Sequence, residues 1–213
     1  MIGAAADPTK VLVAAIAKDS VHGALVVARQ AAEAGFDAVL LTAPLQWERL
    51  TEDEVMLYFR AVADGSPLPV MLGSESGAQG YRLSVDEIAQ LARHGNVIGV
   101  YDEGLAVDRY RAVAEATAGK RREVLVTTVF APVTRRMVRG RQDSAQAESG
   151  LVSAAALVGG TAVATPELKG LKTRTKVVGF QVMAAGSAVG LVELLQAGAA
   201  GAMLTLSASA PHG

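Results

Sequence analysis

A repeated alternation of strand-like and helix-like segments is the feature that most constrains the fold of this chain. Lys10 to Ala17 reads KVLVAAIA, a nearly continuous apolar run typical of a strand buried on both faces. A helical pattern follows, with Ser20 as its expected N-cap and Gly35 as its C-terminal stop. The alternation continues to Gly119 through the strand-like runs DAVLLTAP, LPVMLG and NVIGVYD. This order predicts parallel βαβ units.

The alternation breaks after Lys120 and returns at about Val178. The intervening residues include REVLVTT, a predicted strand, and LKTRTKVV, whose alternation of basic and β-branched residues predicts a strand at a solvent edge. The polar, small residues 142–150 are predicted to be mobile. We therefore expect one αβ barrel-like domain over residues 1–213, with residues 120–178 as an inserted arm or hairpin. That arm contains a cluster of basic residues: Arg135, Arg136, Arg139 and Arg141. We interpret this cluster as a solvated or inter-subunit surface, with an anion site as the less favoured alternative.

The composition excludes several classes of function. The net charge of -1 and the 4% of aromatic residues argue against a nucleic-acid partner, which requires basic surface and stacking side chains. The absence of cysteine excludes disulfides and thiolate chemistry. No apolar run is as long as a membrane span, and the first residues lack the basic and apolar regions of a signal peptide. A cytoplasmic protein with no membrane partner is expected.

The usual cofactor and metal motifs were not found. No GxGxxG or Walker A sequence stands at a strand-to-helix turn. The three histidines, His22, His94 and His212, have no partner at metal-ligand spacing. The sequence thus predicts neither a metal site nor a bound cofactor.

Four segments resemble one known family. They read AAEAGFDAVLLTAP, YFRAVADGSPLPVMLG, LSVDEIAQLARHGNVIGVYD and FQVMAAGSAVGLVELLQAGAAGAMLTLSASAP. They are similar to the dihydrodipicolinate synthase / N-acetylneuraminate lyase family (DapA-like class I aldolases), over Lys10 to about Gly119 and Val178 to Pro211. Members of that family are (β/α)8 barrels that act on pyruvate-type 2-keto acids. The resemblance implies a divergent, partial TIM-type barrel in which the first two βα units are absent and the insertion precedes the penultimate strand.

The resemblance also assigns positions in the site. Tyr101 falls where the family has its Schiff-base lysine, and Gly73 falls where the family has its proton-relay tyrosine. Ser74 follows the relay position, and Ser187 falls where the family has one residue of an acidic pair. The residues expected to contact a substrate are Ser74, Tyr101, Asp102, Ser187 and Met203. Met203 takes the place of an aliphatic residue that contacts substrate. No residue is therefore assigned a catalytic role.

Three hypotheses follow for the function. In the first, the chain is a catalytically degenerate family member, because a phenol at position 101 cannot form an imine. In the second, it is an enzyme with altered acid–base chemistry on a carbonyl substrate, using Tyr101 and the adjacent Asp102. In the third, it is a small-molecule binding or oligomer-partner module. Lys18, which follows the first strand, is interpreted as an exposed loop residue rather than as a substitute amine.

The expected partners follow from the same resemblance. A small 2-keto acid or another carbonyl compound is the expected ligand. The chain is also expected to form a homo-oligomer or to pair with an active paralogue, since an incomplete barrel leaves open sheet edges.

Overall fold

Six strands form one sheet in which all neighbours run parallel. The computed structural model describes residues 6–76, 80–129, 132–139, 172–186 and 189–204. The strand order is β1-β2-β3-β4-β7-β8, and each adjacent pair is parallel. The strands are β1 (Val13–Ile16), β2 (Ala38–Leu41), β3 (Val70–Ser74), β4 (Val97–Glu103), β7 (Gln181–Gly186) and β8 (Gly201–Leu204).

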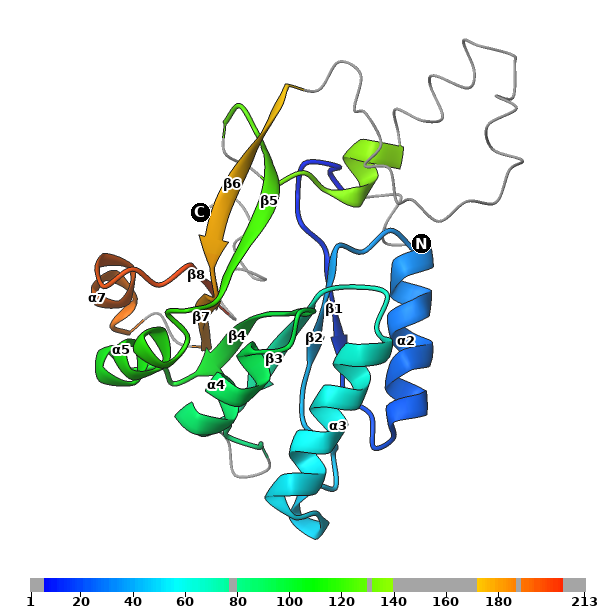
Figure 1. Cartoon of the computed structure of the whole chain (residues 1–213), viewed down its shortest axis with the longest axis vertical. Coiled ribbons are helices and arrows are strands. Elements are labelled where there is room, and N and C mark those ends of the chain that lie inside the picture. Colours follow the sequence, from blue (N-terminus) through cyan, green and yellow to red (C-terminus); the bar gives the residue numbers. More distant parts are fainter. Residues whose placement is uncertain (1–5, 77–79, 130–131, 140–171, 187–188, 205–213) are drawn as a thin grey trace.

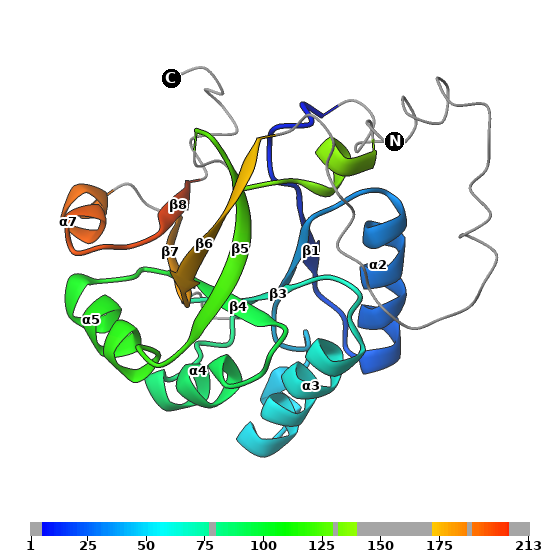
Figure 2. The same cartoon turned by 45° about the horizontal axis from the view of Figure 1, so that its top comes forward.

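Helices cover one face of this sheet, and the sheet curls away from them (Figures 1 and 2). This arrangement is part of a TIM-type barrel, with the helices on its outside. The predicted partial barrel is therefore confirmed. The helices are α2 (Val21–Glu33), α3 (Glu52–Gly65), α4 (Val85–Ala92), α5 (Val107–Ala116) and α7 (Leu191–Gln196), with the 3-10 helix η1 (Trp47–Arg49) after β2.

Local sequence signals set where three of these helices begin. The Ser20 hydroxyl accepts a hydrogen bond from the backbone N–H of Gly23 at the start of α2. Thr51 and Ser84 each form a complete capping box, with Glu54 and Glu87 respectively. Each box satisfies backbone donors that the first helical turn leaves unpaired. The helix start predicted at Ser20 is confirmed.

The hydrophobic core lies between the helices and the sheet. Phe59 of α3, Ile88 and Leu91 of α4, and Leu72 of β3 are fully buried there. None of the helices in the described part of the chain is long and apolar enough to cross a membrane.

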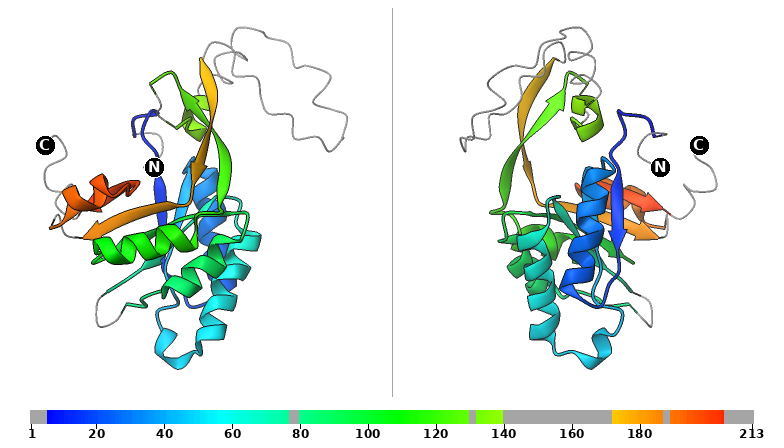
Figure 3. Two further views of the ribbon diagram at one scale, coloured as in Figure 1. Left: turned by 60° about the vertical axis from the view of Figure 1, so that its left-hand side comes forward. Right: turned by 90° about the vertical axis from the view of Figure 1, so that its right-hand side faces the viewer.

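A hairpin stands between α5 and β7 in the chain. β5 (Arg121–Thr127) pairs antiparallel with β6 (Thr173–Gly179), and Gly179 is followed almost directly by the start of β7. Because β6 leads into the beginning of β7, the hairpin projects from the N-terminal end of the parallel strands (Figure 3). The stretch predicted to be mobile, residues 142–150, lies outside the described residues.

The segment 132–139 contacts the N-terminal ends of β1 and β2. The Arg136 guanidinium lies 3.2 Å from Asp37 Oδ2, and the backbone N–H of Arg135 donates to Asp37 Oδ1 at 2.7 Å. The Thr134 hydroxyl donates to the carbonyl oxygen of Pro8. Only 10% of the Arg136 side chain is exposed. For Arg136, the interpretation as a solvated or inter-subunit residue is therefore wrong, because the side chain is held within the chain; Arg141 lies outside the described residues.

Candidate site at the interior rim

The two neighbouring strands β3 and β4 bring the predicted site positions side by side. Their register pairs Gly73 with Tyr101 and Ser74 with Asp102. Successive side chains of a strand point to opposite faces, and Leu72 belongs to the core under the helices. Ser74 and Asp102 thus face the helices, whereas Gly73 and Tyr101 face the interior of the partial barrel. We call the interior-facing residues at the carboxyl ends of β3 and β4 the interior rim: Gly73, Glu75, Tyr101, Glu103.

Tyr101 is a partly buried phenol at this rim. Its hydroxyl donates to the backbone carbonyl oxygen of Met203 in β8, at 3.4 Å. Burial raises the pKa of Tyr101, and the nearby carboxylates of Glu103 and Glu75 raise it further. The side chain therefore stays a neutral phenol at neutral pH. It can donate a hydrogen bond or a proton, but it holds no amine.

Gly73 provides no side chain at the position beside Tyr101, where the resemblance places a proton-relay tyrosine. A Cβ atom built at Gly73 would lie 2.9 Å from Cγ2 of Thr42, the residue that follows β2, which is closer than real Cβ contacts. The Thr42 hydroxyl is itself turned to backbone and donates to the carbonyl oxygen of Ile16 at 3.3 Å. The methyl group of Thr42 therefore occupies space that a larger residue at position 73 would need.

Asp102 is fully buried on the helix side of the sheet. Its Oδ2 lies 2.7 Å from Nε of Arg109 on α5, and its Oδ1 lies 3.5 Å from Nη2 of Arg82. Nη2 of Arg109 also donates to the carbonyl oxygen of Leu83 at 2.6 Å and contacts the Ser74 hydroxyl at 3.4 Å. Burial raises the pKa of Asp102, while the two arginines act in the opposite direction.

The structure thus separates the residues expected to contact substrate. It brings Tyr101 and Met203 together, but Ser74 and Asp102 lie with Arg109 on the other face. Ser187 lies outside the described residues. The period of two along a strand is the signal that separates Tyr101 from its neighbour Asp102.

Two carboxylates at the rim were missed by reasoning from the sequence. Glu75 directly follows β3, and Glu103 is the last residue of β4, so both share the interior side with Tyr101. Oε2 of Glu103 accepts a hydrogen bond from the backbone N–H of Ser76 at 3.3 Å. Burial raises the pKa of Glu75, and the charge of Glu103 adds to that effect. The same period of two would have pointed to them.

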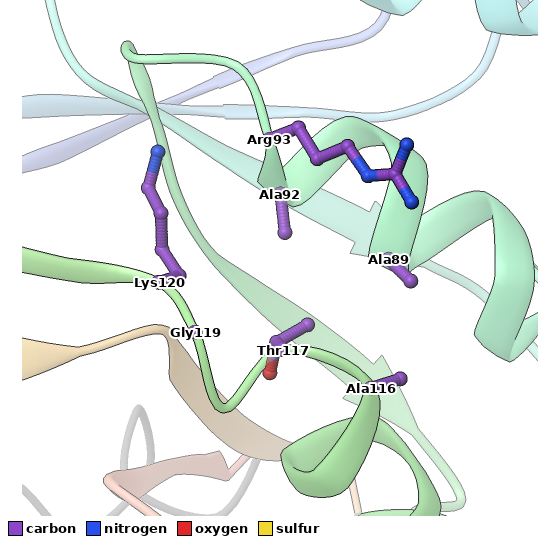
Figure 4. A pocket seen from close by; sticks show the side chains of 7 residues that line it. All are labelled: Ala89, Ala92, Arg93, Ala116, Thr117, Gly119 and Lys120. Atoms are coloured by element: carbon purple, nitrogen blue, oxygen red, sulfur yellow. The ribbon is translucent and has the colours of Figure 1, made fainter.

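Neither Lys18 nor Lys120 brings an amine to the interior rim. Lys18 is exposed, as expected for a loop residue. Lys120 lines an open pocket of about 370 Å³ between the ends of α4 and α5 (Figure 4). It contacts His94, which precedes β4, and so lies at the opposite end of that strand from the rim. Its amine donates to the carbonyl oxygen of His94 at 2.6 Å, and burial lowers its pKa, with a contribution from Arg122. Among the residues that the structure describes, no group of three or more acidic or histidine side chains is placed to hold a metal ion.

The curled parallel sheet, with helices outside and polar side chains at the carboxyl ends of its strands, defines a protein of the α/β-barrel class. The family model described as "Dihydrodipicolinate synthetase family" matches residues 3–124, which is more than half of the chain. The chain belongs to this family, as the resemblance implied.

Relatives with assigned activities are similar over shorter stretches. The chain is 36% identical over 91 residues to 4-hydroxy-tetrahydrodipicolinate synthase 1 of Streptomyces coelicolor, covering 43% of this chain and 30% of that protein. It is 31% identical over 91 residues to L-threo-3-deoxy-hexylosonate aldolase of Aspergillus niger, covering 41% and 27%.

A solved structure shows the same fold over a longer stretch. The 4-hydroxy-tetrahydrodipicolinate synthase of Methylacidiphilum fumariolicum SolV matches with a TM-score of 0.59 and 19% identity, covering 92% of this chain and 46% of that one. These three matches therefore span less than half of each of those proteins.

Proposed function

We propose that this chain is a catalytically degenerate member of the dihydrodipicolinate synthetase family, without Schiff-base lyase activity. The observation that carries the proposal is Tyr101, which stands at the tip of β4 where the resemblance places the lysine. Imine formation requires a primary amine as nucleophile, and a phenol cannot supply it. The hydroxyl of Tyr101 is instead bonded to the backbone of Met203.

Two further features support this proposal. The relay position, Gly73, has no side chain, and Thr42 blocks the space for one. A free lysine also has a pKa near 10.4, so that only about 0.04% of it is neutral at pH 7 without a special environment. Lys18 is exposed to solvent, and the pKa of Lys120 is lowered at a pocket away from the rim.

Trapping with borohydride tests the proposal directly. The protein is incubated with pyruvate and sodium borohydride, and its intact mass is measured; an N-acetylneuraminate lyase treated in parallel serves as the positive control. We expect the control to gain one reduced pyruvyl group and this chain to remain unmodified. A stoichiometric adduct on this chain would contradict the proposal, and peptide mapping would show whether Lys18 or Lys120 carries it.

Acid–base chemistry on a carbonyl compound is the second candidate function. It is favoured by the position of Tyr101 beside the carboxylates of Glu75 and Glu103, which together offer a proton donor and proton acceptors. Asp102, the partner expected from the sequence, is engaged by Arg109 on the helix side, so Glu103 would take its place. Proton exchange at the methyl group of pyruvate in D₂O, followed by NMR, tests this candidate. Exchange that is abolished by Tyr101→Phe would support it over the degenerate reading.

A further inference from the structure

The two carboxylates of the interior rim flank the position of the family's lysine. Ser74 pairs with Asp102 in the register of β3 and β4, so the residues that follow them, Glu75 and Glu103, are neighbours at the ends of adjacent strands. Both side chains are partly buried. The hydrogen bond from the Ser76 N–H to the Glu103 carboxylate holds that carboxylate at the rim.

The charges that act on Tyr101 are both negative. Glu103 and Glu75 are the two ionised groups that raise the pKa of its phenol. Arg82 also reaches this end of β4, and its Nη1 donates to the backbone carbonyl oxygen of Glu103 at 3.2 Å. Its Nη2 lies 3.5 Å from the Asp102 carboxylate on the helix side. The guanidinium of Arg82 is thus engaged away from the two rim carboxylates.

This charge opposes the chemistry of a Schiff-base aldolase in two ways. The substrate, a 2-oxo acid, is an anion at neutral pH, so the rim repels it. The nucleophile must be a neutral amine, and carboxylates next to an amine favour its protonated form. Both effects would persist even if a lysine stood at position 101.

We propose that Glu75 and Glu103 are specificity-determining residues that exclude anionic 2-oxo acids from the interior rim. The proposal rests on the proposed function, in which the chain lacks Schiff-base activity. It adds that the negative charge of the rim, as well as the absence of a lysine, prevents this activity. An opposite charge within about 4–6 Å shifts a pKa by about 1–3 units, and each unit changes the neutral fraction of an amine about tenfold. We therefore expect an effect of about tenfold or more on imine formation.

The test compares two variants that both carry an amine at the rim. One is Tyr101→Lys, and the other combines Tyr101→Lys with Glu75→Gln and Glu103→Gln. Each is incubated with pyruvate and cyanoborohydride at low and high salt, and the initial rate of adduct formation is measured by intact mass. The triple variant is expected to react at least about tenfold faster at low salt. High salt should increase the rate of adduct formation by Tyr101→Lys but not by the triple variant, because salt screens the rim carboxylates that only Tyr101→Lys retains.

A matched control carries the same change in charge elsewhere. Glu115 on α5 and Glu123 on β5 are exposed and belong to elements that meet at the N-terminal end of the sheet. Tyr101→Lys combined with Glu115→Gln and Glu123→Gln should react like Tyr101→Lys alone. The proposal would be overturned if Tyr101→Lys and the triple variant with Glu75→Gln and Glu103→Gln reacted at equal rates, or if neither formed an adduct. An adduct on the unmodified chain would instead overturn the proposed function, so the two failures are distinguishable.

The pKa of Tyr101 itself provides a second test, which applies even if a lysine at position 101 prevents folding. The phenol of Tyr101 is titrated by ¹³C NMR in tyrosine-labelled protein, with Tyr101→Phe used to assign the signal. The pKa of Tyr101 should fall when Glu75→Gln and Glu103→Gln are introduced together, and stay unchanged with the control pair at Glu115 and Glu123. An unchanged pKa in the rim variant would overturn the proposal.

Discussion

Replacing Arg109 with leucine tests how much of the stability of this fold depends on one buried ion pair. The Asp102 carboxylate is fully buried, and 18% of the Arg109 side chain is exposed, so the pair is largely shielded from solvent. Removing one partner of such a pair leaves an uncompensated charge and typically costs about 3–5 kcal/mol. The carbonyl oxygen of Leu83 also loses the hydrogen bond from Arg109.

The assay is reversible unfolding in urea, with thermal unfolding as a second readout. A loss of about 3–5 kcal/mol corresponds to a fall in Tm of roughly 6–20 °C, at about 2–4 °C per kcal/mol for a domain of this size. Arg111→Leu is the matched control on the same helix. Its side chain is 70% exposed and pairs with the exposed Asp108, so the control should change stability by less than about 0.5 kcal/mol.

The pH dependence of the loss identifies its cause. Burial already raises the pKa of Asp102 in the folded state, and removal of Arg109 should raise it further, above the value of about 3.9 in the unfolded chain. The folded state then binds the proton at higher pH than the unfolded state, so stability falls as pH rises through this window. The deficit of Arg109→Leu should therefore be largest at neutral pH and shrink as the pH approaches 4.

Removing both charges completes the test. Arg109→Leu combined with Asp102→Asn should be more stable at neutral pH than Arg109→Leu alone, because no buried charge is left without a partner. The reasoning is refuted if the double variant is no more stable than the single one, or if Arg109→Leu behaves like Arg111→Leu.

Three further predictions concern other parts of the chain. Arg136→Leu should lower the free energy of unfolding in urea by about 3–5 kcal/mol, because it leaves the Asp37 carboxylate without its charged partner. Arg135→Ala removes an exposed side chain and should change this free energy by less than about 0.5 kcal/mol; equal losses in the two variants would contradict the prediction. Gly73→Ala should lower the free energy of unfolding by about 1–3 kcal/mol through overpacking against Thr42. Adding Thr42→Ser, which removes Cγ2, should restore most of the lost stability in urea unfolding, and no recovery would refute the steric cause. The chain should self-associate at micromolar concentration, and Val192→Glu on α7, where that side chain is 67% exposed, should lower the mass seen by light scattering; a compact monomer before substitution would contradict this.

The local elements of this protein could be predicted from its sequence. The capping boxes begun by Thr51 and Ser84 and the apolar run before Ala17 depend on residues within one or two turns of each other. The order of these elements, together with the family resemblance, was enough to predict a partial parallel barrel. The position of Tyr101 at a strand tip was predicted in the same way, because it requires only the strand and its end.

The environment of the site was decided by tertiary structure. Tyr101 and Asp102 are adjacent in the chain, yet one reaches the backbone of Met203 across the interior and the other is bound by Arg109 beneath the helices. Likewise, Arg136 pairs with a carboxylate 99 residues earlier in the chain, although its sequence neighbourhood reads as a solvated basic cluster. Strand register and helix packing bring such groups together, and these depend on contacts between distant segments. The sequence therefore determines which residue types stand at the rim, whereas assembly of the sheet determines the face on which each side chain lies and the charged groups near it.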